Sequence, residues 1–221
     1  MGTSAELVVL NFTKFGENSI VLHTLSREYG RRGFLIRGVG KKTSMSLFLP
    51  LNIVEADITE NPKSTLWFAK NVMVRYPLIG IRNNMYKNSM TMFMSEVLYR
   101  VIREGSNEEG LFDWCVRSIL TLDAIESDFG NYHIRFLLEF ANALGFSPNF
   151  DGLMPFLSKS QFVDKNLIDR FLQSSFSETM LIKLNGEQRN ELAGHLIKYI
   201  EFHTESAVNV KSLAVLRELY I

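Results

Sequence analysis

Cysteine is nearly absent from this sequence of 221 residues, and long apolar runs are absent altogether. Its one cysteine, Cys115, cannot form an internal disulfide or a cysteine-cluster zinc site. No apolar stretch approaches the roughly 20 residues of a membrane-spanning helix, so we expect no integral membrane protein. The N-terminus has no basic segment followed by an apolar stretch, so we expect no secretory signal. A cytoplasmic protein is the resulting expectation.

Motifs of catalysis and metal binding are also missing. Gly33 and Gly38 have the spacing of P-loop glycines, but the lysine and Ser/Thr that a P-loop requires do not follow them. The sequence contains no Gly-x-Ser-x-Gly elbow and no His-Glu-x-x-His pair. His195 and His203 have no carboxylate or cysteine at a spacing that would make a strong zinc site. We therefore predict a protein that is not an enzyme and that uses no cofactor or metal.

Charge is balanced overall but unevenly distributed along the chain. Residues 1–103 carry 14 basic and 7 acidic side chains, whereas residues 104–221 carry 10 basic and 17 acidic ones. The densest basic stretch, residues 25–45, contains one acidic residue, Glu28, and these six basic ones: Arg27, Arg31, Arg32, Arg37, Lys41 and Lys42. A surface of one sign can hold a polyanion, although a merely solvated basic face has the same composition.

The first 80 residues have the alternating pattern of β-strands. Five short segments are rich in β-forming residues and are separated by Gly and Pro turns: Glu6–Phe12, Ser19–Leu25, Gly33–Val39, Asn52–Ile58 and Thr65–Tyr76. In the last of them one face is expected to hold Leu66, Phe68, Val72 and Val74. Five short strands in so few residues predict a small closed barrel or a sandwich.

After Pro77 the apolar residues recur with helical spacing. The expected helices contain the apolar stripes of Met90–Val101, Leu111–Leu122, His133–Leu144, Leu167–Leu172, Leu192–His203 and Leu213–Tyr220. Gly145 has the place of a C-cap glycine, and Cys115 is expected to pack as a small apolar residue. We predict one domain over residues 1–80 and a helical one over 81–221, with an irregular loop at 145–163.

Several short motifs follow one another in order along the chain. The N-terminal ones are Phe15-Gly16-Glu17, Leu25-Ser26-Arg27-Glu28-Tyr29-Gly30, the basic stretch Phe34–Lys42, and Leu49-Pro50-Leu51-Asn52-Ile53-Val54-Glu55. The later ones are Arg135–Phe140, Leu144-Gly145-Phe146, Tyr199–His203 and Lys211-Ser212-Leu213. Together they resemble RecO, a family of bacterial recombination mediators, over nearly the whole chain.

The resemblance implies an α+β protein in which an N-terminal OB-fold barrel binds nucleic acid and an α-helical domain follows. It also implies binding of single- and double-stranded DNA, annealing of complementary strands, and loading of RecA onto strands coated by single-strand-binding protein. The partners implied are RecR and the C-terminal tail of single-strand-binding protein, with RecA involved indirectly and no membrane.

OB folds hold single strands with a basic groove and aromatic platforms. We therefore expect the six basic residues of the stretch 25–45 to contact phosphates, beside Tyr29 and Phe34. Because side chains alternate along a strand, Arg31 and Arg37 are expected to face away from Arg32. Annealing requires phosphate neutralisation and no covalent chemistry. The alternatives are a barrel that binds a protein partner and, third, a nuclease that uses scattered carboxylates.

Many members of the family carry four cysteines as a zinc site after the central helix, and this chain has none there. The same region instead contains Phe146, Phe150, Met154, Phe156 and Phe162. We infer that apolar packing holds this region, and zinc binding is not carried over.

The family's helical domain receives the acidic tail of single-strand-binding protein, whose end carries a free carboxylate. An arginine beside apolar side chains suits such a ligand. Arg135 is the candidate, with Tyr132 and Leu138 one turn away on its helix face. The alternative is an exposed arginine that pairs with Glu139, four residues on.

Overall fold

The structure, a computed structural model, describes residues 2–40, 43–157 and 164–219. The chain forms two compact units: unit 1 comprises Met1–Ile79 and Ile102–Leu120, and unit 2 comprises Gly80–Val101 and Thr121–Ile221. The first break lies next to the boundary predicted at residue 80. Residues 102–120, which follow the first long helix, belong to the unit of the barrel.

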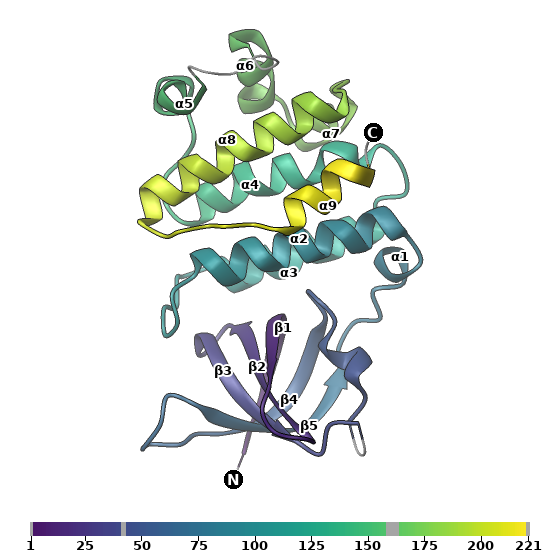
Figure 1. Cartoon of the computed structure of the whole chain (residues 1–221), viewed down its shortest axis with the longest axis vertical. Coiled ribbons are helices and arrows are strands. Elements are labelled where there is room, and N and C mark those ends of the chain that lie inside the picture. The colour runs from purple at the N-terminus through teal and green to yellow at the C-terminus, as the bar shows by residue number, and fades with distance from the viewer. Residues whose placement is uncertain (1, 41–42, 158–163, 220–221) are drawn as a thin grey trace. The chain divides into compact units, whose positions relative to one another are not determined.

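Unit 1 is built on a closed five-stranded barrel (Figure 1). The strands are β1 (Thr3–Lys14), β2 (Ser19–Ser26), β3 (Gly30–Arg37), β4 (Ile53–Thr59) and β5 (Trp67–Val74). Their order around the barrel is β1-β2-β3-β5-β4, and the long β1 pairs antiparallel with both β2 and β4. A short parallel pairing of β3 with β5 completes the ring. The predicted fold class, an OB-fold barrel followed by a helical region, is confirmed.

Alternate side chains of the strands fill the barrel. Leu7 and Val9 of β1 and Phe34 and Ile36 of β3 are buried together in its core, as the period of two along a strand requires. A 3-10 turn, η1 (Met45–Phe48), lies between β3 and β4 in the chain and adds the buried ring of Phe48 to the same core.

The face predicted for the last strand is wrong. Phe68, Val72 and Val74 were expected to share one face, but Val72 is buried, whereas Phe68 and Val74 are 36% and 48% exposed. The buried residues of β5 are Ala69 and Val72. They are three apart because Asn71 has a left-handed backbone (φ 54°) where the pairing of β4 with β5 shifts its register. This extra residue changes the side to which the following residues point.

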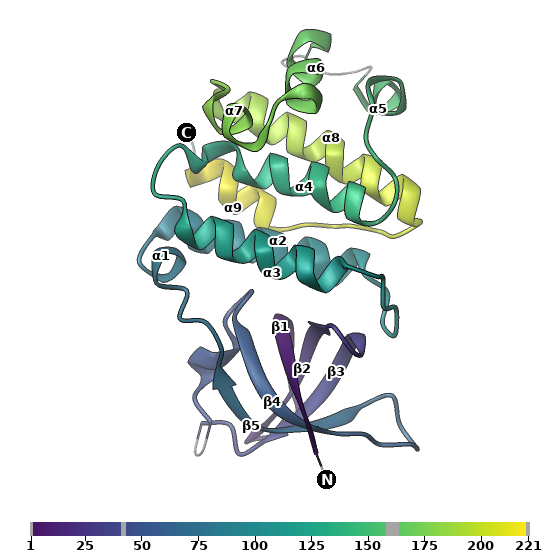
Figure 2. The same cartoon turned by 180° about the vertical axis from the view of Figure 1, so that it is seen from behind.

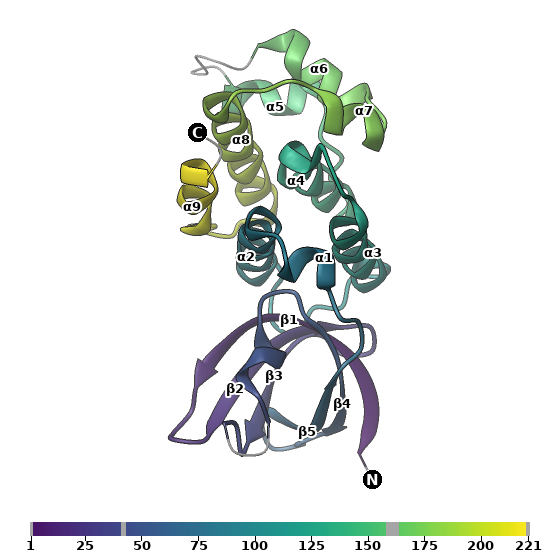
Figure 3. The same cartoon turned by 90° about the vertical axis from the view of Figure 1, so that its right-hand side faces the viewer.

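Unit 2 is helical, and Figure 3 looks nearly along its longest helices. The helices of the described residues are α1 (Ile79–Arg82), α2 (Met85–Val101), α3 (Leu111–Ala124), α4 (Tyr132–Ala143), α5 (Phe150–Leu157), α6 (Lys165–Gln173), α7 (Phe176–Leu181), α8 (Gly186–Thr204) and α9 (Ser212–Leu219). Most of α3, up to Leu120, belongs to unit 1. Helix α2 packs against α9, and α4 packs against α8. The six predicted helices are present, and Gly145 has the positive φ of 89° expected of a C-cap glycine.

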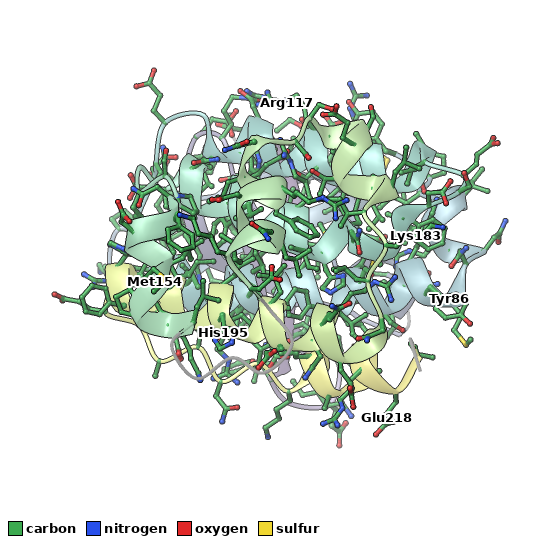
Figure 4. All side chains as sticks on the ribbon, turned by 90° about the horizontal axis from the view of Figure 1, so that it is seen from above. Tyr86, Arg117, Met154, Lys183, His195 and Glu218 are labelled. Carbon is green, nitrogen blue, oxygen red and sulfur yellow. The ribbon has the colours of Figure 1, made fainter. Side chains whose placement is uncertain are left out.

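Helix α5 is a correction, because residues 145–163 were predicted to be an irregular loop. The side chain of Asn149 accepts a hydrogen bond from the backbone N–H of Gly152 at 2.8 Å, which caps the start of the helix. Helix α5 packs against α8, and Figure 4 shows Met154 of α5 beside that helix, on which His195 is labelled. The apolar side of α5 therefore finds a partner that lies far along the chain.

Cys115 is buried in α3, as expected, and burial raises the pKa of its thiol to about 12. No helix in the described ranges has the length and apolar character needed to cross a membrane.

Candidate nucleic-acid interface

Strand β3 sends its arginines to opposite sides. Phe34 and Ile36 point into the core, and Arg32, two residues before Phe34, has the same parity. Arg31 and Arg37 have the other parity, which agrees with the expected alternation. The basic stretch is therefore divided between surfaces. Lys41 and Lys42, which complete the predicted set, lie outside the described residues.

Arg31 is bound to the segment that follows α2. Its side chain donates a hydrogen bond to the carbonyl of Ile102, and its backbone N–H donates to the carbonyl of Ser106 at 3.0 Å. The same segment explains Gly30, since a Cβ atom there would lie 1.9 Å from the Ser106 oxygen. Arg31 therefore holds unit 1 together as well as adding positive charge.

Arg27 also has partners within unit 1. Its guanidinium forms an ion pair with Asp113 and lies 5.0 Å from the ring centre of Phe112. Its hydrogen bond to Asp113 raises the pKa of Arg27 above its ordinary value. A phosphate that binds Arg27 must compete with this carboxylate.

Arg32 and Trp67 form a stack at one end of the barrel. The Arg32 guanidinium carbon lies 4.0 Å from a ring centre of Trp67, a close cation–π distance. Trp67 in turn packs edge-on against Tyr29 and Phe34, at 5.1 and 6.4 Å between ring centres. The indole is held in place by these contacts. Phe34 itself is fully buried and is not the aromatic platform that the sequence predicted.

The stack borders a cavity of about 480 Å³ whose remaining wall is the connection between β4 and β5. That connection supplies Glu60, Asn61, Pro62, Lys63, Ser64 and Thr65. Figures 1 and 2 show it extending beside β3. The size is typical of a small-molecule or nucleotide site.

A second arginine–aromatic pair lies on the outer side of the same strands. Arg37 is exposed, and its guanidinium carbon lies 5.5 Å from the ring centre of Phe68. Phe68 pairs with Leu35 across β3 and β5, just as Trp67 pairs with Phe34. Two neighbouring residues of β5, Trp67 and Phe68, thus each contact an arginine, and the two arginines lie on opposite faces of the strand. Such pairs offer cationic donors for phosphates and ring surfaces for bases.

Trp67, Phe68 and the residues of the β4–β5 connection were not identified from the sequence. Their signal was available in the adjacent pair Trp67-Phe68 next to Lys63 and Lys70. Their arginine partners, Arg32 and Arg37, lie 35 and 31 residues earlier in the chain, so closeness in sequence does not connect them.

The predicted tail-binding residues lie in unit 2, on α4. Arg135 donates from Nε to Glu139 at 2.6 Å and from Nη1 to the carbonyl of Ser174 at 3.0 Å. Its side chain is 23% exposed, whereas Tyr132 and Leu138 are both buried. The predicted ion pair with Glu139 is therefore present. The tail site itself stays a prediction that rests on one partly exposed arginine.

Aromatic contacts join α5 and the preceding turn to α8. Phe146 stacks on His203 at 5.0 Å, and Phe156 contacts Tyr199 and Phe202, each at 5.8 Å between ring centres. Phe162 lies outside the described residues. Within the described part of the chain, no group of three or more His, Cys, Asp or Glu side chains is placed to hold a metal ion.

The barrel and the helical unit define an OB-fold protein whose basic, aromatic surface suits a polyanion. The family description "Recombination protein O N terminal" matches residues 1–75, and "Recombination protein O C terminal" matches residues 82–152. The chain belongs to the RecO family of DNA repair and recombination proteins, as the sequence motifs implied.

Similar proteins support this membership over nearly the whole chain. A DNA repair protein RecO from Phocaeicola vulgatus is 28% identical, over 96% of this chain and 97% of its own length. One from Flavobacterium psychrophilum is 26% identical over the full length of both. One from Azobacteroides pseudotrichonymphae is 24% identical over 96% of this chain and 97% of its own.

Proposed function

We propose that this protein is a non-enzymatic recombination mediator of the bacterial cytoplasm, associated with the nucleoid. It binds single- and double-stranded DNA, anneals complementary strands and helps to load RecA onto strands coated by single-strand-binding protein. RecR and the tail of single-strand-binding protein are its proposed protein partners. Residues 1–80 are the proposed DNA-binding domain, and residues 81–221 are the proposed domain for protein contacts.

One observation carries the proposal: β3 and β5 present two arginine–aromatic pairs, Arg32 with Trp67 and Arg37 with Phe68. Arginine supplies phosphate contacts, and the rings supply surfaces for unpaired bases. Neutralising phosphates on two strands lowers their mutual repulsion, so complementary bases can pair without any bond being made or broken.

A salt titration of DNA binding tests this function. Affinity for single strands should fall with salt, with a log–log slope near −0.7 for each phosphate that the protein neutralises. Changing Arg37, Lys41 and Lys42 together to alanine should weaken duplex binding and flatten its slope by about two to three units, at roughly 0.9 for each phosphate no longer neutralised. Arg217→Ala, which removes one positive charge from α9 in unit 2, is the control and should leave the slope unchanged.

The outcomes separate the candidate functions. A folded triple variant that binds like the wild type would show that the phosphate contacts lie elsewhere. No binding of any DNA at low salt would favour the alternative in which the barrel binds a protein partner. Release of nucleotides in the presence of magnesium would favour a nuclease.

A further inference from the structure

The Arg32 guanidinium lies over the ring of Trp67 and has unused hydrogen-bonding capacity. A guanidinium has five N–H donors. The one hydrogen bond that the Arg32 side chain makes among the described residues runs from Nη1 to the Thr65 carbonyl, at a long 3.4 Å. Its Nε is buried and has no partner within the described part of the chain. The two terminal nitrogens carry the other four N–H groups, of which the Thr65 bond uses one, so Arg32 can donate to an acceptor that enters the cavity.

The same cavity contains a carboxylate. Glu60 lines it together with Arg32, yet no ion pair joins these two described side chains. Arg32 can only donate hydrogen bonds, and Glu60, when ionised, can only accept them. A phosphate offers acceptors alone and is repelled by Glu60. The ligand that satisfies both side chains has an acceptor edge and a donor edge, and the flat indole of Trp67 favours a ring.

We propose that this cavity binds one unpaired nucleobase and prefers guanine. The O6 and N7 atoms of guanine accept two hydrogen bonds from an arginine fork. Its N1–H and N2–H₂ groups form a neighbouring pair of donors that matches the two oxygens of Glu60. Adenine presents a donor beside N7 and lacks the N1–H, so it satisfies neither side chain fully. In a duplex, N1–H and N2–H₂ of guanine are already bonded to cytosine, so the site selects unpaired bases.

The inference rests on the proposed function, because a base reaches the cavity only when the barrel binds a strand. The test uses labelled oligothymidines of about twelve nucleotides, a length within the range of OB-fold sites. Their single central position is dG, dA, dC or dT. Fluorescence anisotropy at low salt should show that the dG strand binds about fivefold or more tightly than the dT strand, the discrimination of one bidentate base contact. The same dG placed in a duplex should give no preference.

Two variants assign the preference to the cavity. Glu60→Gln should abolish the preference for dG without weakening binding of the all-dT strand. Arg32→Lys keeps the charge but removes the fork, so it should reduce the preference while the salt slope stays the same. Lys63→Gln is the matched control in the same wall and should weaken all four strands alike.

Equal, salt-dependent binding of all four strands by the wild type would overturn the base-binding site and make Arg32 a plain phosphate contact. A preference for dG that survives Glu60→Gln would also overturn it, because the donor edge would then be read elsewhere. If no strand binds at all, the proposed function fails together with this inference.

Discussion

Replacing Glu96 should weaken the packing of the C-terminal helix α9 against α2. Glu96 lies on α2, and its Oε2 accepts hydrogen bonds from the backbone N–H of Ser212 at 2.9 Å and from the Ser212 hydroxyl at 2.6 Å. The backbone N–H of Lys211 also donates to it. The carboxylate thus satisfies donors at the start of α9, where a helix has no intrahelical acceptors.

The size of the expected destabilisation follows from these contacts. A hydrogen bond to a charged group contributes about 1.5–3 kcal/mol, and the Glu96 side chain is largely buried. Because Glu96→Ala leaves these donors to water or unpaired, we expect it to lower the free energy of unfolding by about 2–4 kcal/mol. Ser212→Ala should cost less, since the backbone donors remain. The double variant should show a coupling of about 1 kcal/mol or more between the two side chains.

The effect should depend on pH. Burial alone would raise the pKa of Glu96, but the hydrogen bonds from Ser212 and Lys211 outweigh burial and hold the pKa below its ordinary value. A carboxylate with a depressed pKa in the folded state stabilises the protein above the pKa of the unfolded state, about 4.3. That stabilisation disappears as the pH falls through the lower, folded-state pKa. The difference in the free energy of unfolding between the wild type and Glu96→Ala should therefore be largest at pH 7 and should decrease below about pH 4.

Urea unfolding followed by circular dichroism measures the destabilisation at both pH values. Limited proteolysis between α8 and α9 reports directly on release of the C-terminal helix. Glu218→Ala, on the exposed side of α9 and labelled in Figure 4, is the control and should change stability by no more than about 0.5 kcal/mol. A Glu96→Ala protein as stable as the control, or equally destabilised at pH 7 and pH 3, would refute this reasoning.

Three further predictions concern the helical unit. Burial, followed by the charge of Arg189, lowers the pKa of His133 to about 3. The imidazole is therefore protonated near pH 6.5 in the unfolded chain but stays neutral in the folded chain until about pH 3. As the pH is lowered from 7 to 3, the free energy of unfolding should fall by up to about 1.4 kcal/mol per pH unit. His133→Gln should flatten this dependence in urea titrations, and an unchanged slope would contradict it. Elemental analysis should find no stoichiometric zinc, and chelators should leave the Tm unchanged; one zinc per chain would overturn the apolar packing inferred for residues 145–163. Arg135→Ala should weaken binding of an acidic tail peptide by about 1.5–3 kcal/mol while DNA binding stays intact, and equal peptide binding would leave Arg135 only its contacts with Glu139 and Ser174.

Local pattern was sufficient to predict much of the architecture. A period of two identified the five strands, a period of 3.6 identified six helices, and turn residues separated them. These patterns are local because each reflects which side of one element faces the core. The order of short motifs along the chain was sufficient to predict the family, because motif order can be compared without knowing which residues are in contact.

The tertiary structure alone decided what the basic residues touch. Arg27 pairs with Asp113, 86 residues away, and Arg32 stacks on Trp67, 35 residues away. No periodicity encodes such partners, because they depend on how strands pair around a closed barrel. The exposed position of Phe68 likewise followed from strand pairing, because Phe68 lies opposite the exposed Thr59 of β4, whereas Ala69 lies opposite the buried Ile58. Beyond this pair, the left-handed residue Asn71 shifts the register of β5 against β4. One residue of register reverses the side that every later side chain faces, so the sequence determined that β5 is a strand and the barrel determined its outer face.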